Sequence, residues 1–353
     1  MKFFSVFVLG TITSVLLGCS PQPGAPAGAS STIINGAGAT FPYPIYSKWA
    51  YAYQAATGVK VNYQSIGSGG GISQIKNQTV DFGASDSPLT IEELTESKLV
   101  QFPLVVGGIV PVVHIEGVAS GKLRLTPKLL ADIFLGRIKT WDAAELKAAN
   151  PDLKLPAKEI AVVHRADGSG TTWIFTSYLS ETSSAWKEKV GVGKSVSWPV
   201  GVGGKGNEGV AAYVDRIDGS IGYVEYAYAL QNKMPYALLE NRAGKYPEPA
   251  IKTFQAAAAN ADWKSAPGYY VVLVNQPGDA SWPITGASFI LIHKDQPNAE
   301  HATAMLRFFD WSYRKGAAAA EELDYVPIPL KVVELVEATW DQELRSGGKP
   351  VPH

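Results

Sequence analysis

The sequence is poor in several residues on which common site chemistries depend. Its 353 residues include one cysteine, five histidines and only 18% charged side chains, against roughly 25% in an average soluble protein. A single cysteine excludes an internal disulfide framework, a cysteine-based zinc site and an iron–sulfur cluster. The histidines are scattered without the spacing of metal ligands. We therefore expect neither a metal nor a cofactor.

An excess of basic side chains is also missing. The chain has 31 Lys and Arg against 32 Asp and Glu, a formal net charge of −1, which argues against a general nucleic-acid binder. Apolar residues make up 46% of the chain, so the low hydrophobicity and high net charge of disordered proteins are absent. The length fits two domains, with one large domain as the alternative.

The N-terminal segment has the pattern of a targeting sequence. Lys2 precedes an apolar run over residues 3–17, shorter than the ~20 residues of a membrane-spanning helix and typical of a secretory signal. The run ends Leu-Leu-Gly-Cys19, which resembles the lipobox of bacterial lipoproteins; a plain signal peptide with an incidental cysteine is the alternative. We expect a signal peptide over residues 1–18, lipid attachment at Cys19 and a flexible tether over residues 19–31.

Strand-like and helix-like segments alternate along the remaining chain. Short apolar runs predict strands at 59–66, 80–84, 159–166, 221–226 and 287–293, and the run 102–115, interrupted by two glycines, predicts two consecutive buried strands. Apolar residues at helical spacing predict helices over 72–76, 129–134, 170–180, 207–217, 305–309 and 332–340. The alternation predicts an α/β fold with mostly parallel sheets.

Glycine is abundant, with 35 residues, about 10% of the chain against a usual ~7%. Much of the surplus lies in four expected strand-to-helix turns at 36–41, 67–71, 167–171 and 201–207. Such turns place free backbone N–H groups at helix N-termini, which attract anions. For any one of these turns alone, an ordinary capped loop is the better explanation, but three of them also carry hydroxyl side chains, and Arg165 precedes the third.

Several nucleotide and hydrolase motifs fail in these turns. Gly-x-Gly-x-x-Gly fails at 36–41 and 67–72 because Phe41 and Ile72 occupy the last position, and Gly204-Lys205 is not followed by Ser or Thr as a phosphate-binding P-loop requires. No Gly-x-Ser-x-Gly nucleophile elbow occurs. The residues therefore favour an anion cradle over an enzyme.

Several long segments resemble one protein family. They are GAGATFPYPIYSKW, VNYQSIGSGGGI, VDFGASDSPL, RADGSGTT, GGKGNEG, IGYVEYAYA, WPITGASFILIHKD and FFDWSYRKGA. In order and spacing they are similar to the periplasmic phosphate-binding proteins of bacterial high-affinity phosphate ABC importers, from about Ile34 to the C-terminus. The resemblance implies a two-lobed periplasmic-binding-protein fold, each lobe a mostly parallel sheet flanked by helices, joined by a hinge.

The family's activity implies the function of this chain. It is expected to bind inorganic phosphate in the periplasm as a monomer, to deliver it to a permease of two membrane-spanning and two ATPase subunits, and to catalyse nothing. The resemblance also implies the ligand contacts: Thr40, Phe41, Ser68, Asp86, Arg165, Ser169, Gly170 and Thr171, with Asp167 holding the Arg165 guanidinium.

Asp86 carries the expected selectivity. Phosphate near neutral pH keeps one or two protons and sulfate keeps none, so a buried carboxylate can accept a phosphate O–H but opposes the lone pairs of sulfate. From the residues alone, an N-cap or turn carboxylate before Pro88 explains Asp86 better than a ligand role, and a surface pairing with Asp167 explains Arg165 equally well.

In a two-lobed fold the chain must cross between the lobes, and the expected crossings divide the chain. Gly107-Gly108 and 283–286 are the expected crossings, giving one lobe of 32–105 plus 286–353 and a second of 106–285. Two other functions remain open from the sequence: an enzyme acting on phosphate esters, and a binding protein for another oxyanion such as sulfate or molybdate.

Overall fold

A computed structural model describes residues 1–2 and 32–353. Most of the expected signal peptide (1–18), all of the expected tether (19–31) and Cys19 lie outside the described residues. Residues Thr32–His353 form one compact unit, and every element discussed below belongs to it.

One sheet passes through this unit. Its strands are β1 (Ile33–Gly38), β2 (Lys60–Ser65), β3 (Phe82–Ser85), β4 (Leu99–His114), β6 (Ala161–Arg165), β7 (Val202–Gly204), β8 (Ser220–Glu225), β10 (Thr285–His293) and β11 (Val326–Pro327). The strand order is β2-β1-β3-β10-β4-β8-β6-β7, with β11 added to β4. Two small pairs complete the strands: β5 (Arg124–Leu125) with β9 (Leu238–Leu239), and β12 (Arg345–Ser346) with β13 (Lys349–Pro350).

The two ends of the sheet are parallel and its middle is antiparallel. Strands β2, β1 and β3 run parallel at one end, and β8, β6 and β7 run parallel at the other. Between them, β10 is antiparallel to both β3 and β4, and β4 is antiparallel to β8. We call these groups the β1 end and the β6 end of the sheet. Each end has the mostly parallel α/β order that the sequence predicts.

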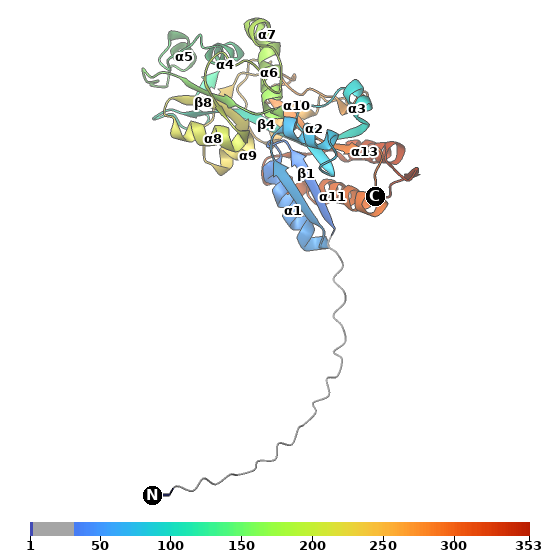
Figure 1. The fold of residues 1–353 in the computed structure, drawn as a ribbon. Helices are drawn as coiled ribbons and strands as arrows, with labels where there is room; N and C mark the ends of the chain where they lie inside the picture. Colours follow the sequence, from blue (N-terminus) through green and yellow to red (C-terminus); the bar gives the residue numbers. More distant parts are fainter. Residues whose placement is uncertain (3–31) are drawn as a thin grey trace. The chain divides into compact units, whose positions relative to one another are not determined.

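Helices surround both ends. They are α1 (Tyr43–Thr57), α2 (Ser68–Lys76), α3 (Ile91–Ser97), α4 (Pro127–Phe134), α5 (Ala144–Ala149), α6 (Gly170–Thr182), α7 (Ser184–Lys189), α8 (Gly206–Arg216), α9 (Tyr226–Gln231), α10 (Ile251–Ala258), α11 (Ala299–Arg314), α12 (Ala317–Glu321) and α13 (Leu330–Glu343), with a short 3₁₀ turn η1 (Pro267–Tyr269). Figure 1 shows α1, α2, α11 and α13 around β1, and α4, α5, α8 and α9 around β8.

The expectation of two consecutive strands over 102–115 is wrong, because this segment belongs to the single strand β4. Gly107 and Gly108 do not interrupt it; they pair with Gly286 and Thr285 of β10. A side chain at Gly108 would collide with the Phe254 ring, so glycine is needed for packing at a point where the strand continues. From Ile109 onward β4 pairs with β8 instead.

Two smaller expectations also need correction. The fourth expected strand-to-helix turn is shorter than 201–207, since β7 occupies 202–204 and α8 begins at Gly206. Tyr226, expected to close a strand, is the first residue of α9, and the Glu225 side chain caps this helix by accepting the Ala227 N–H. Glu225, a polar residue at the end of a buried strand, could have indicated from the sequence that a helix begins there.

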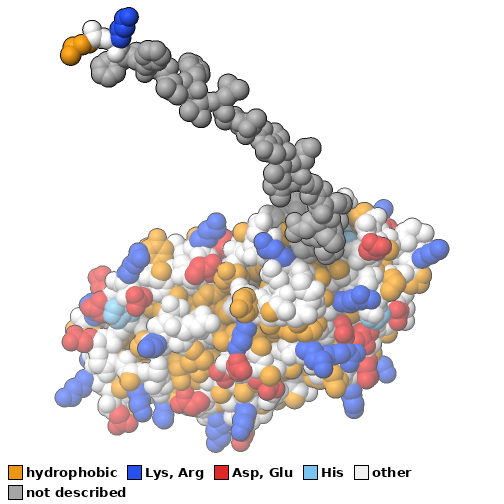
Figure 2. Space-filling model, turned by 90° about the horizontal axis from the view of Figure 1, so that it is seen from below, with side chains coloured by type: hydrophobic (Ala, Val, Ile, Leu, Met, Phe, Trp, Pro, Cys, Tyr) orange, Lys and Arg blue, Asp and Glu red, His pale blue; other side chains and the backbone are white. Residues whose placement is uncertain are grey.

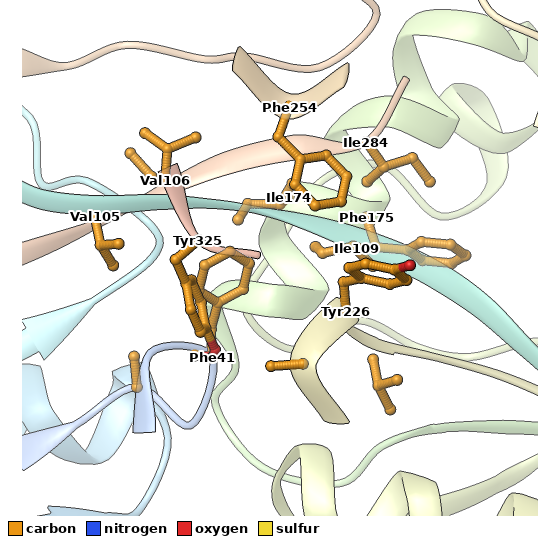
Figure 3. Packing of buried hydrophobic residues seen from close by; sticks show 14 of the residues in the cluster. Phe41, Val105, Val106, Ile109, Ile174, Phe175, Tyr226, Phe254, Ile284 and Tyr325 are labelled. Atoms are coloured by element: carbon orange, nitrogen blue, oxygen red, sulfur yellow. Dashed lines mark hydrogen bonds between the residues drawn. The ribbon is translucent and has the colours of Figure 1, made fainter. Parts of the chain in front are cut away.

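The core is continuous between the two ends of the sheet. One hydrophobic cluster extends from Ile34 of β1 to residues beyond α13. Figure 3 shows Phe41 beside Tyr325 next to β4, with Phe175 and Tyr226 farther along the same strand; the Phe41 and Tyr325 rings meet edge to face at 6.2 Å. Edge-to-face pairs add to the free energy gained by burial, so the chain is firmly packed where β4 changes partners.

The surface carries charges of both signs. On the face seen in Figure 2, basic and acidic side chains are interspersed, with hydrophobic side chains between them. None of the helices in the described part of the chain has both the length and the hydropathy of a membrane-spanning segment.

Candidate anion-binding site

The residues expected to bind the ligand lie where strands end. Thr40 and Phe41 follow β1, Ser68 opens α2 after β2, and Asp86 follows β3 directly. At the other end of the sheet Arg165 closes β6. Ligands of open α/β sheets bind outside the carboxyl ends of parallel strands. The predicted ligand contacts are buried there, and the supporting Asp167 is partly exposed.

Hydrogen bonds join the predicted residues across the two ends of the sheet. The Gly170 N–H, in the first turn of α6, donates to Ser68 Oγ at 3.0 Å, and Ser68 Oγ also accepts the Asp86 N–H at 3.2 Å. The backbone N–H of Gly69 donates to the Gly168 carbonyl at 2.8 Å. The glycine-rich turns at 67–71 and 167–171 are therefore in direct contact.

Glycine at position 170 allows this approach. A Cβ there would lie 2.5 Å from Ser68 Oγ and 2.6 Å from the Cβ of Asp86. The next residue, Thr171, has a backbone N–H that donates to none of the described residues, and Ser169 caps the helix by accepting the Thr172 N–H at 3.0 Å. The N-terminus of α6 thus presents one unpaired donor, the Thr171 N–H, and the positive end of a helix dipole to the site.

Arg165 supplies the positive charge and is held in place. Its Nε and Nη2 donate to the two carboxylate oxygens of Asp167 at 2.8 and 2.6 Å, and Nη1 donates to Thr171 Oγ1 at 3.3 Å. Burial raises the pKa of the Asp167 carboxyl, but the hydrogen bonds and charge of Arg165 outweigh burial, so the pKa is lowered. Asp167 is therefore an anion that fixes the plane of the guanidinium, as a bidentate pair does.

Asp86 is a buried carboxyl with little to stabilise its charge. Its side chain is 1% exposed, its Oδ1 has no hydrogen-bond partner among the described residues, and Oδ2 lies 3.5 Å from Ser68 Oγ. Burial raises its pKa to about 7. The Ser288 hydroxyl, which lies nearby without a hydrogen bond of standard geometry, and the charge of Arg165 offset only part of this. The group is ready to accept a proton from a ligand.

Two tyrosines fix the turn that follows β1. Tyr228 of α9 donates to the Thr40 carbonyl at 2.6 Å, and Tyr325 donates to the Phe41 carbonyl at 2.7 Å. Because a peptide unit is planar, holding the Thr40 carbonyl also orients the Phe41 N–H, for which no acceptor exists among the described residues. This N–H belongs to Phe41, one of the ligand contacts that the family resemblance implies.

Glu225 lies beside the same hydroxyl. The Tyr325 hydroxyl donates toward two acceptors, the Phe41 carbonyl at 2.7 Å and Glu225 Oε2 at 2.6 Å. Burial, together with the negative charge of Asp86, raises the pKa of Glu225 well above its usual range despite hydrogen bonds that lower it. The raised pKa favours the neutral form of Glu225.

Four side chains of this neighbourhood were missed from the sequence: Asn207, Glu225, Tyr228 and Tyr325. Asn207 sits in the fourth glycine-rich turn, so its position was within reach of the sequence. Its backbone N–H and Nδ2 both donate to Thr40 Oγ1, at 3.1 and 2.6 Å. The three other residues come from segments without glycine-rich turns, and only the tertiary fold brings them here. Among the described residues, no group of three or more His, Cys, Asp or Glu side chains could hold a metal ion.

Comparisons with known proteins agree with this architecture. A family model described as "PBP superfamily domain" matches residues 23–315. The chain is 56% identical over 313 residues to "Phosphate-binding protein PstS" of Pasteurella multocida (strain Pm70), covering 89% of this chain and 91% of the relative.

Solved structures show the same fold. A high-affinity periplasmic phosphate-binding protein bound with phosphate superposes with a TM-score of 0.71 at 24% identity, covering 90% of this chain and 97% of that one. A putative phosphate ABC transporter substrate-binding protein with bound phosphate, from Clostridium perfringens, gives 0.61 at 17%, covering 84% and 100%. The expected two-lobed α/β fold is confirmed, and the chain belongs to the PBP superfamily and, within it, to the family of phosphate-binding proteins PstS.

Proposed function

We propose that this protein binds inorganic phosphate in the periplasm and delivers it to the permease of a phosphate ABC importer. The observation that carries the proposal is the pairing of opposite groups in one buried site. Arg165 and the unpaired N–H groups of Phe41 and Thr171 lie in the same buried, hydrogen-bonded neighbourhood as Asp86, a carboxyl with a free acceptor oxygen. A protonated oxyanion needs both kinds of group at once, whereas an unprotonated one needs donors alone.

The proposed ligand contacts follow from the geometry. Phe41 and Thr171 offer backbone N–H groups, and Arg165 offers its charge. The hydroxyls of Thr40, Ser68, Ser169 and Thr171 complete the donors. Gly170 contributes chiefly by allowing close approach, because its own N–H is donated to Ser68 Oγ.

Selectivity against sulfate rests on Asp86. A phosphate O–H can donate to the free Oδ1, while sulfate has no proton to give and places a lone pair against the carboxylate. Placing a sulfate oxygen against the Asp86 carboxylate in a site without water costs on the order of several kcal/mol of binding free energy. At ~1.4 kcal/mol per factor of ten, this corresponds to about three or more decades in affinity.

The two lobes form the second part of the proposal. We place one lobe at residues 32–105 plus 286–353 and the other at 106–285, which assigns Thr40, Ser68 and Asp86 to one and Arg165 to the other. The partner change of β4 after Gly108 supports this boundary. A ligand that touches both lobes favours the closed state by its differential affinity for it, and a permease of two membrane-spanning and two ATPase subunits would distinguish loaded from empty protein in this way.

The location follows from the N-terminal segment. We propose that residues 1–18 direct the chain to the periplasm, that Cys19 carries the lipid, and that 19–31 tether a monomeric binding protein to a membrane. Mass spectrometry of the mature protein tests this: a lipid-modified N-terminus at Cys19 supports the anchor, and an unmodified cysteine contradicts it.

Isothermal titration calorimetry tests the binding proposal. After bound anion is removed, phosphate should bind far more tightly than sulfate, and equal affinities would refute the proposal. In Asp86→Asn the amide can donate as well as accept, so sulfate should gain relative to phosphate. Asp132→Asn is the matched control, because Asp132 is also buried but pairs with Lys128 of α4 and with Arg137, which follows this helix; its phosphate-to-sulfate ratio should equal that of the wild type.

We further propose that the protein is not an enzyme. The site holds hydroxyls but no histidine beside them that could act as a base among the hydrogen bonds described above. Incubation of the purified protein with a generic phosphate monoester should release no phosphate; turnover that is lost in Arg165→Ala would contradict this.

A further inference from the structure

Asn207 is the centre of a hydrogen-bond network that joins both ends of the sheet. It is fully buried in the first turn of α8. Its Nδ2 donates to Thr40 Oγ1 at 2.6 Å and to Thr171 Oγ1 at 3.2 Å, and its Oδ1 accepts the Glu225 N–H at 2.9 Å. One amide group therefore contacts a hydroxyl from each end of the sheet.

The backbone settles which way this amide points. The Glu225 N–H can only donate, so the atom facing it must be the amide oxygen. The NH₂ group then faces the two hydroxyls, with one proton for each. The reversed amide would set two donors against each other in a buried place, which is costly.

The lone pairs of both hydroxyls are consequently occupied. Thr40 Oγ1 accepts from the backbone N–H and from the side chain of Asn207. Thr171 Oγ1 accepts from Asn207 Nδ2 and from Arg165 Nη1, at 3.2 and 3.3 Å. A hydroxyl has two lone pairs and one proton, so each of these oxygens keeps only its proton for a further partner.

We propose that Asn207 is a positioning residue that makes the Thr40 and Thr171 hydroxyls obligatory proton donors toward the bound anion. This inference rests on the proposed phosphate site. Without the Asn207 side chain, each hydroxyl could rotate and act as a hydrogen-bond acceptor instead, so that a lone pair would face a ligand oxygen. With Asn207 in place, Asp86 is left as the acceptor for a ligand proton.

The wild-type protein gives a direct test. In NMR spectra of the protein saturated with inorganic phosphate, the hydroxyl protons of Thr40 and Thr171 should exchange slowly and correlate with the phosphorus nucleus across the hydrogen bond. Correlations from the Phe41 amide proton without any from the hydroxyls would overturn the inference while leaving the phosphate site intact. Absence of phosphate binding altogether would overturn the proposed function instead.

Substitution gives a second test. Asn207→Leu keeps the size of the side chain and removes its donors, and should weaken phosphate binding at least about tenfold at about pH 8. At about pH 5.5, where phosphate carries a second proton, a freed hydroxyl can accept that proton, so the loss should be smaller. A purely structural defect would weaken binding equally at both pH values, and that result would overturn the inference.

Two controls accompany the variant. Asn150→Leu removes a buried asparagine whose partners Arg124 and Leu146 lie outside the site, and should leave the affinity within about twofold. In a Thr40→Val background, Asn207→Leu should reduce phosphate affinity by a smaller factor than in the wild type, because one of the hydroxyls that Asn207 orients is gone. If the two substitutions reduce the affinity by independent factors, the proposed role is contradicted. If Asn207→Leu does not fold, the NMR measurement decides.

Discussion

Replacement of Asp86 by asparagine should stabilise the ligand-free protein at neutral and higher pH. In the folded protein the pKa of Asp86 is raised from 3.8 to about 7, because burial disfavours the carboxylate. Between about pH 4 and pH 7 the folded state therefore holds a proton that the unfolded state has released. Stability is fully present below the unfolded pKa, falls as pH rises through this window, and levels off above the folded pKa.

The size of the fall follows from the shift. One pKa unit corresponds to 1.36 kcal/mol, so a shift of about three units gives about 4 kcal/mol between about pH 4 and pH 8. Asparagine does not ionise, and the variant lacks this contribution. The free energy of unfolding should therefore decline by about 4 kcal/mol more in the wild type than in Asp86→Asn over this range.

Urea unfolding followed by tryptophan fluorescence measures this difference, with phosphate removed. Asp167→Asn is the control of opposite sign: the pKa of Asp167 is lowered by Arg165, so its contribution is lost only below the window. Asp167→Asn should be less stable than the wild type but parallel to it between about pH 4 and pH 8. Parallel curves for Asp86→Asn and the wild type would refute the reasoning, since they would mean that the buried carboxylate carries no penalty.

Other substitutions probe the remaining parts of the site. Gly170→Ala should abolish tight phosphate binding in calorimetry, because the new Cβ would lie 2.5 Å from Ser68 Oγ; retained affinity would show that the turns separate at no cost. Arg165→Lys should weaken phosphate binding about 10- to 100-fold, because an ammonium cannot replace the fork that contacts Asp167 and Thr171. Tyr325→Phe leaves the Phe41 carbonyl and Glu225 without their hydroxyl and should lower the free energy of unfolding by about 2–4 kcal/mol. Tyr178→Phe, which removes a buried hydroxyl that has no partner among the described residues, should change it little, and equal losses would contradict the assignment. Phosphate affinity should depend only weakly on salt, because Arg165 is already paired with Asp167 and a buried site is poorly screened.

Much of the fold was within reach of local patterns. The helices that contain Phe308 and Trp340 show apolar spacing, and the structure places α11 and α13 there. The prediction of two strands around Gly107 and Gly108 was wrong. Glycine generally weakens a strand, but here Gly108 leaves room for the Phe254 ring while the strand continues. That reason depends on a residue about 150 positions away, which no local pattern contains.

The candidate site divides in the same way. Hydroxyl and glycine residues in strand-to-helix turns pointed to an anion cradle from the sequence, and the structure sets Ser68, Asp86 and Gly170 in contact. The roles of Tyr228 and Tyr325 could not be predicted, because each acts through a carbonyl group and carbonyl groups have no sequence signature. Their contribution becomes visible only when the partners of the Thr40 and Phe41 carbonyls are traced.

The proposed selectivity and the predicted instability have one origin at Asp86. Its Oδ1 has no partner in the described part of the chain, so the folded state carries an unsatisfied carboxyl. At the proposed site a phosphate O–H would satisfy it and release the free energy that ionisation costs the fold, while sulfate brings no proton and would release none. The stability penalty of about 4 kcal/mol is therefore also the scale of the discrimination that Asp86 can provide, about a thousandfold. A variant that regains stability at pH 8 by losing this carboxylate must lose selectivity by a comparable amount, so the denaturation and calorimetry measurements on Asp86→Asn have to agree with each other.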